Sequence, residues 1–240
     1  TAYFGDLHVH TSYSLDSYIG MNRVSPEEAY VFAKGGTVES AAGPVRLTKP
    51  LDFAAVTDHV EFMPEMAIAL DPEHPKHNSE LAVQFRNDEK DADLARFVFV
   101  NYIIGRGRPE IQEKLNAYCS REEAPAVLKD AWARLAEITE RHNDPETFTT
   151  LHGFEWTSAP DRTNLHRNVI FRDANVPEIP VTARYNPDPE ALWDALETYR
   201  AAGMHVLAIP HNSNASRGLM FAPQRFDGSP IDRAYAERRA

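Results

Sequence analysis

The sequence predicts an α/β fold in which mostly parallel strands build an incomplete, barrel-like sheet. Two observations lead to this fold class. Apolar and β-branched runs alternate with helical patterns in the order strand, helix, strand, which favours right-handed crossovers. Histidines and carboxylates stand at or just after the ends of these runs, and the carboxyl ends of parallel strands gather side chains on one face.

The first part of the chain is expected to supply two strands around one helix. Residues 3–10 form the first strand. Ser25 is a helix N-cap and Glu28 completes a capping box, so a helix is expected over 26–33. Residues 51–58 are mostly apolar, as is typical of a parallel strand buried on both faces.

The remainder is expected to hold a helical insertion and three further strands within one domain spanning residues 1–240. Residues 60–146 lack strong strand patterns and carry helical ones, best over 124–142. Five strands leave a barrel unclosed, so we expect truncation at the C-terminus, with the native protein continuing beyond Ala240. The later elements are strands over 147–156, 166–171 and 205–209 and a helix over 189–202.

Composition and charge exclude several function classes. A formal net charge of −11 argues against nucleic acid or an anionic membrane as partner. No apolar run approaches the ~20 residues of a membrane span. The single cysteine, Cys119, excludes an internal disulfide and a Cys-rich zinc module. We expect a soluble protein, cytoplasmic or periplasmic after signal removal, and the oligomeric state is left open.

Imidazole and carboxylate groups recur in four segments at predicted strand ends. His8 and His10 are two positions apart, so they share one face of an extended strand and can bind one ion. A lone histidine at a strand end is more often a satisfied polar residue than a ligand, but the joint pattern favours one site. Imidazole with carboxylate is the ligand set of zinc, manganese and iron. The candidate ligands are His8, His10, Asp16, His59, Glu155, His166 and His211.

The sequences of these segments resemble the motifs of the PHP superfamily, which is named for polymerase and histidinol phosphatase, and in particular those of a DUF3604-like branch. The resemblance extends from residue 3 to about residue 221 and leaves out the insertion. It implies a distorted (β/α)7 TIM-like barrel and a metal-dependent phosphoesterase centre. The segments are His8-Val9-His10 with Asp16, Thr57-Asp58-His59, Phe154-Glu155-Trp156 followed by Asn164-Leu165-His166, and Ile209-Pro210-His211-Asn212.

The resemblance also implies how the ligands divide among two or three divalent ions (Zn, Mn or Fe). The late Asp-x-His pair of that family does not occur after His211, so the third site is expected to be emptier than the other two. Asp58 is expected to orient a ligand histidine or to cap a helix. By position, His8 and His10 hold the first ion, Glu155 bridges to the second, His166 and His211 complete the second, and Asp16 and His59 hold the third.

The activity so implied is hydrolysis of a phosphate ester by a metal-bound hydroxide at a di- or trinuclear site. Glu155 would bridge two ions, and His59 or a metal-bound water would protonate the leaving group. The partner is then a small phosphorylated substrate, either a monoester or a diester. Substrate contacts are expected from Arg167, whose forked donor suits phosphate, and from Asn212 and Tyr13.

Two other functions remain open. An amidohydrolase also begins with His-x-His on a barrel strand, but here no lysine ends a strand and Thr57-Asp58-His59 does not fit that class. A metal-binding but catalytically incomplete fragment is the second alternative, because of the missing Asp-x-His. His152 is expected to be structural, since it lies three residues before Glu155 and faces the other side of a strand.

Overall fold

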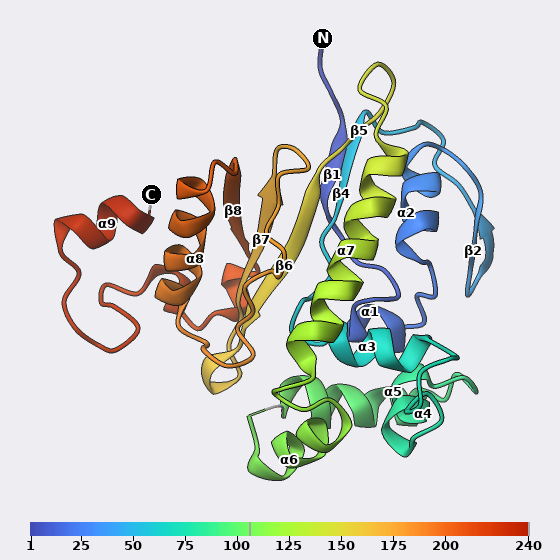
Figure 1. Ribbon diagram of the computed structural model, residues 1–240, viewed down its shortest axis with the longest axis horizontal. Helices are drawn as coiled ribbons and strands as arrows, with labels where there is room; N and C mark the ends of the chain where they lie inside the picture. Colours follow the sequence, from blue (N-terminus) through green and yellow to red (C-terminus); the bar gives the residue numbers. More distant parts are fainter. Residues whose placement is uncertain (106, 240) are drawn as a thin grey trace.

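The structure, a computed structural model, describes residues 1–105 and 107–239, so the expectation that the protein continues beyond Ala240 concerns a region outside the described residues. Within this range the strands form three small sheets (Figure 1). The first sheet is parallel, in the order β1 (Gly5–Val9), β4 (Phe53–Val56), β5 (Thr149–Thr150). The second is antiparallel, in the order β6 (His152–Ser158), β7 (Leu165–Phe171), β8 (Val206–His211). A hairpin of β2 (Val38–Ser40) and β3 (Gly43–Val45) is the third.

The prediction of a parallel TIM-like barrel is therefore wrong. Residues 159–164, which include the 3₁₀ turn Pro160–Arg162 (η2), are all that joins β6 to β7. A parallel crossover needs about a dozen residues or more, so this short link can only make a hairpin. β8 also runs antiparallel to β7, although helix α8 (Pro189–Ala201) lies between them in sequence. No closed barrel forms within the described part of the chain.

The two larger sheets meet along one bent stretch of chain, residues 149–158. Its first part pairs with β4, and Leu151 N donates to Ala54 O at 3.0 Å. Further on, Glu155 N donates to Asp58 O at 3.0 Å, which forms an isolated bridge beyond the end of β4. From the other side, the Asn168 amide donates to Leu7 O at 2.9 Å and ties β7 to β1. The ends of β1, β4 and β6 are therefore held together.

The insertion is helical, as predicted. Helices α3 to α6 gather beyond the end of the sheets opposite to the N-terminus (Figure 1). The predicted capping box of α2 (Pro26–Ala33) is present, since Glu28 N donates to Ser25 Oγ and Ser25 N donates to Glu28 Oε2. The remaining helices are α1 (Leu15–Ile19), α3 (Met63–Leu70), α4 (Glu80–Arg86), α5 (Ala92–Val98), the π-helix Phe99–Ile104 (η1), α6 (Pro109–Tyr118), α7 (Ala124–His142), α9 (Arg233–Arg239) and the 3₁₀ turns Ser213–Ala215 (η3) and Leu219–Phe221 (η4).

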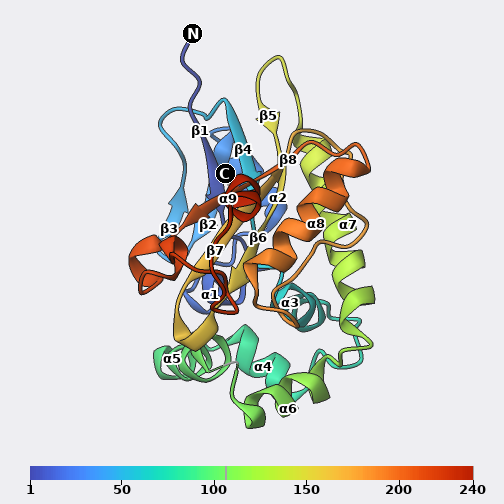
Figure 2. The ribbon, with the colours of Figure 1, turned by 90° about the vertical axis from the view of Figure 1, so that its left-hand side faces the viewer.

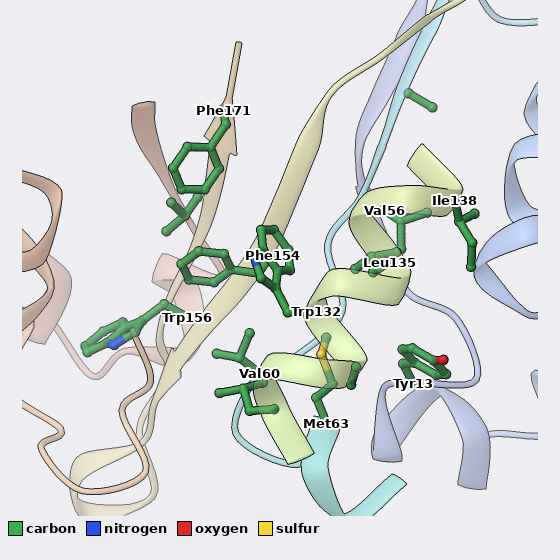
Figure 3. Close-up of a cluster of buried hydrophobic side chains, with 14 of the residues drawn as sticks. Tyr13, Val56, Val60, Met63, Trp132, Leu135, Ile138, Phe154, Trp156 and Phe171 are labelled. Carbon is green, nitrogen blue, oxygen red and sulfur yellow. The ribbon is translucent and has the colours of Figure 1, made fainter. Parts of the chain in front are cut away.

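Helices α7 and α8 cover one face of the strands (Figure 2), and the main core lies beneath them. Trp132 of α7 is 2% exposed and packs edge-on against Phe154 of β6, with ring centroids 5.8 Å apart (Figure 3). Because side chains alternate along a strand, anchoring Phe154 and Trp156 in this core sends Glu155 and Thr157 to the opposite face. No helix of residues 1–105 and 107–239 combines the length and apolar character needed to cross a bilayer.

Cys119 is expected to be inert in the folded protein. Its side chain is fully buried, and burial, together with the charge of Glu65, raises the pKa of the thiol to about 12. Because the thiolate is the reactive form, Ellman's reagent should label almost no thiol in the native state and one per chain in guanidinium. Rapid labelling of the native protein would contradict the buried position.

Candidate metal centre

The carboxylate of Glu155 is fully buried and lies amid the predicted ligand histidines. Among the described residues, five histidines place a ring nitrogen within 3.5 Å of it. Oε2 lies 3.1 Å from His8 Nε2 and 3.0 Å from His10 Nε2. Oε1 lies 2.7 Å from His166 Nδ1, 3.0 Å from His211 Nε2 and 3.5 Å from His59 Nδ1.

Sheet register explains this convergence. His166 is the second residue of β7 and lies opposite Thr157 of β6 on one side and His211 of β8 on the other. The antiparallel direction of β7 therefore brings His166, and the last residue of β8, beside the second half of β6, next to Glu155. His59 arrives through the bridge to Glu155 beyond β4. The side chains named as candidate ligands thus lie together even though the predicted strand direction is wrong.

Three groups of ligand atoms could each hold an ion within the part of the chain that the structure describes. They divide the residues differently from the resemblance, which paired His8 with His10 and His166 with His211. His8 and His10 can still share an ion, because their Nε2 atoms are 2.9 Å apart. Ligand atoms on one ion at ~2.1 Å are separated by about 3.0–3.4 Å for octahedral to tetrahedral geometry. The groups are His8, Glu155 and His211; His10, Asp16 and His59; and His59, Glu155 and His166.

Hydrogen bonds behind His10 indicate which of its nitrogens faces the centre as an acceptor. Ser14 Oγ donates its one proton to Asp58 Oδ1 at 2.8 Å, so it accepts from His10 Nδ1 at 2.9 Å. The Nε2 lone pair of His10 then points at Glu155 Oε2. Two acceptors at 3.0 Å repel unless a proton or a cation lies between them. An imidazole nitrogen that acts as an acceptor and lies beside a carboxylate is therefore a fitting donor pair for a divalent metal.

The pKa values of the acidic groups in the centre also indicate a site that favours positive charge. Burial by itself disfavours the Glu155 anion, but the surrounding imidazoles, His59 foremost, hold the pKa of Glu155 well below its usual range. Burial opposes the charged form of His59, yet Glu155 and Asp16 raise the pKa of His59 to about 9. Burial is likewise outweighed at Asp16, whose contact with His59 lowers its pKa to about 2. The carboxylates therefore stay ionised and attract cations.

Asp58 lies behind the ligands, as predicted, and fixes the loop that follows β1. Its Oδ1 accepts from Thr11 N at 2.6 Å and its Oδ2 accepts from the Thr11 hydroxyl at 2.6 Å. Ser14 connects Asp58 to His10, and its Oγ also accepts from His59 N at 3.0 Å. Such partners set the orientation of ligand histidines.

Removing the Ser14 hydroxyl should weaken metal binding without unfolding the protein. Ser14→Ala leaves His10 free to rotate and takes a donor from Asp58, so we expect the metal dissociation constant to rise about 10–100-fold. Competition with a chromophoric chelator measures this. Ser12→Ala is the matched control, because Ser12 is also buried and bonds Val24 O through its main-chain amide. Equal affinity in both variants would contradict the assigned role.

The predicted substrate contacts are only partly brought to the centre. Asn212 lines the cavity of about 350 Å³ that opens on Glu155. Arg167 follows His166 on β7 and therefore faces the other side, where it lies 5.8 Å over the Trp156 ring. Tyr13 is buried in the main core (Figure 3). His152 also faces away and contacts Glu140 Oε1 at 2.6 Å, as predicted.

Sequence reasoning missed several residues around the centre. Thr157 contacts His59 Nδ1, and its position two residues after Glu155 was a usable signal. Arg162 and Asn164, on the turn between β6 and β7, line the cavity. The apolar wall of the cavity comes mostly from the insertion, whose placement no local pattern reveals. That wall consists of Leu15 of α1 together with Phe62, Phe99, Ile103 and Ile104 of the insertion.

Comparison with known proteins gives one finding. The family described as "Protein of unknown function (DUF3604)" matches the whole chain, residues 1–240. No curated protein and no solved structure matches it. The family description names no activity, so the PHP resemblance stays an interpretation of the motifs.

Proposed function

The chain belongs to the DUF3604 family, and we propose that it is a metal-dependent hydrolase acting on phosphate esters. One observation carries the proposal: a fully buried carboxylate shared by several imidazoles at the wall of an open cavity. Structural metal sites fill their coordination with protein ligands, whereas catalytic sites leave a position open to the substrate. Ligand groups next to a cavity favour the second kind.

Each part of the centre has a chemical role under this proposal. Divalent ions held by the three ligand groups would supply an activated water near neutral pH and would neutralise charge on the phosphoryl oxygens. His59 lines the cavity between Glu155 and Asp16. When the group of His10, Asp16 and His59 holds no ion, His59 Nε2 can carry a proton that is placed to reach a leaving oxygen. When that group holds an ion, the proton would come from a metal-bound water. Ser14 and Asp58 keep His10 in its orientation.

Arg162 supports phosphate in place of the predicted Arg167. The protein carries a net charge of −11, but Arg162 lines the cavity, as do Asn164 and Asn212. A planar fork of N–H donors matches two phosphoryl oxygens. We therefore assign Arg162 to substrate binding.

The test is turnover of 4-nitrophenyl phosphate and bis(4-nitrophenyl) phosphate by protein loaded with Mn²⁺ or Zn²⁺, with 4-nitroacetanilide as an amide control. We expect hydrolysis of one or both phosphate esters and none of the anilide. Arg162→Ala should raise KM about tenfold or more, whereas Arg172→Ala, an exposed arginine paired with Asp173, should not. Failure of the loaded protein to cleave any phosphate ester would reject the proposal.

A further inference from the structure

Part of the lining of the cavity at Glu155 is apolar, although the same cavity borders an ionic centre. Phe99 and Ile104 line the cavity while each is 42% exposed, and Phe62 and Ile103 extend the same surface. Large apolar side chains left beside a polar centre mark surface that a ligand covers. Nothing in the metal chemistry requires such a wall, since a metal centre and a phosphate are both polar.

A π-helix produces this wall. The bond from Gly105 N to Val100 O, 3.1 Å, spans five residues, as expected of this conformation. Tyr102 is buried on the inner side and packs edge-on against Phe85, with ring centroids 5.4 Å apart. Residues four and five positions apart share a face in such a helix, so Phe99, Ile103 and Ile104 line the cavity together. π-Helical turns are rare and are concentrated at functional sites.

A second cavity adjoins this wall. It has a volume of about 390 Å³ and shares Glu61, Phe62, Ile104, Ala159 and Arg162 with the cavity at the metal centre. Together they exceed what inorganic phosphate or a methyl ester would fill, since pockets of ~300–1,000 Å³ hold drug-sized ligands. The space for the non-reacting part of a substrate therefore begins at the π-helix.

We propose that the substrate carries an aryl or bulky alkyl group next to its phosphoryl group, and that this group packs on Phe99, Ile103 and Ile104. The inference rests on the proposed hydrolase function, because it takes the phosphoryl group to lie at the metal centre. Binding removes the organic group of the substrate and the apolar side chains of the wall from water, which favours the complex. This contribution to affinity does not depend on how fast the ester is hydrolysed. Specificity for the organic group thus lies in the insertion, while the ligands lie on the strands.

Phosphonates can test whether the apolar wall binds the organic group. They are not hydrolysed as esters are, so the different reactivity of aryl and alkyl esters does not affect the comparison. With the full chain loaded with Mn²⁺, dissociation constants for phenylphosphonate and methylphosphonate are measured by calorimetry. We expect phenylphosphonate to bind at least tenfold more tightly. Phe99→Ala and Ile104→Ala should each remove most of this preference and leave methylphosphonate unchanged. Phe97→Ala is the matched control, because Phe97 is 46% exposed on α5 and lies outside the cavity walls formed by the described residues.

The outcomes separate the two proposals. If the protein hydrolyses 4-nitrophenyl phosphate but binds both phosphonates equally, the role of the apolar wall in substrate binding is rejected and the proposed hydrolase function stands. A preference for phenylphosphonate that depends on Phe99, without turnover of any phosphate ester, would reject the hydrolase and keep the wall as a ligand site. Equal weakening of both phosphonates by Phe99→Ala, or failure of phenylphosphonate to bind, would overturn the inference.

Discussion

Replacing Glu155 by glutamine is expected to strip the protein of most of its metal. Glu155 contributes to two of the three ligand groups, and the third, built on His10, Asp16 and His59, does not contain it. The substitution keeps the size of the side chain and removes its charge, so the imidazoles lose the anion that balances a bound cation. Elemental analysis of the purified variant should find at most one ion per chain. Turnover should fall by more than the ~10–100-fold that outer-shell partners cost.

Two control variants make this result specific. Asp16→Asn should remove only the ion of the third group, because Asp16 belongs to that group alone. His152→Ala should keep the full metal content, since His152 faces away from Glu155 and contacts Glu140. If Glu155→Gln and His152→Ala lost metal equally while well folded, the facing of β6 would be wrong.

Local signals were enough to predict which side chains would gather around Glu155. Alternation along a strand decides that Glu155 and His152 face opposite sides, and it needs no knowledge of the neighbouring strands. The capping box of Ser25 and Glu28 is equally local, and it forms as expected. The same alternation, applied to His166 and Arg167, would have excluded Arg167 from the cavity.

Non-local features were not predictable in the same way. A strand has the same period in parallel and antiparallel sheets, so the apolar run over 166–171 does not reveal the direction of β7. The direction follows instead from the link 159–164, which is too short for a parallel crossover. The apolar wall depends on how residues 60–146 dock, and helical periodicity does not determine docking. Only the structure places Phe99 and Ile104 in the same cavity as Glu155.

Removing the metal with a chelator is expected to abolish turnover and to lower the melting temperature while leaving the protein folded. The main core, centred on Trp132 and Phe154, contains none of the ligands and should survive. The centre itself loses the cations between its acceptors, including the Nε2 atoms of His8 and His10 at 2.9 Å. An ion present at about 100 times its dissociation constant stabilises the folded state by about 2.7 kcal/mol. For a chain of this length that corresponds to roughly 5–10 °C.

Which ion restores the turnover and melting temperature of the chelated protein tests whether imidazole nitrogens bind the metal. Mn²⁺ or Zn²⁺ should recover both turnover and melting temperature, because imidazole nitrogens predominate in the ligand groups. Mg²⁺ should recover neither at the same concentration, since it demands oxygen ligands and gives up its waters reluctantly. Calorimetric melts of the chelated, Mn²⁺-loaded and Mg²⁺-loaded protein measure this directly. Equal melting temperatures in all three would mean that the histidines around Glu155 are satisfied by protons alone, and the metal centre would have to be abandoned.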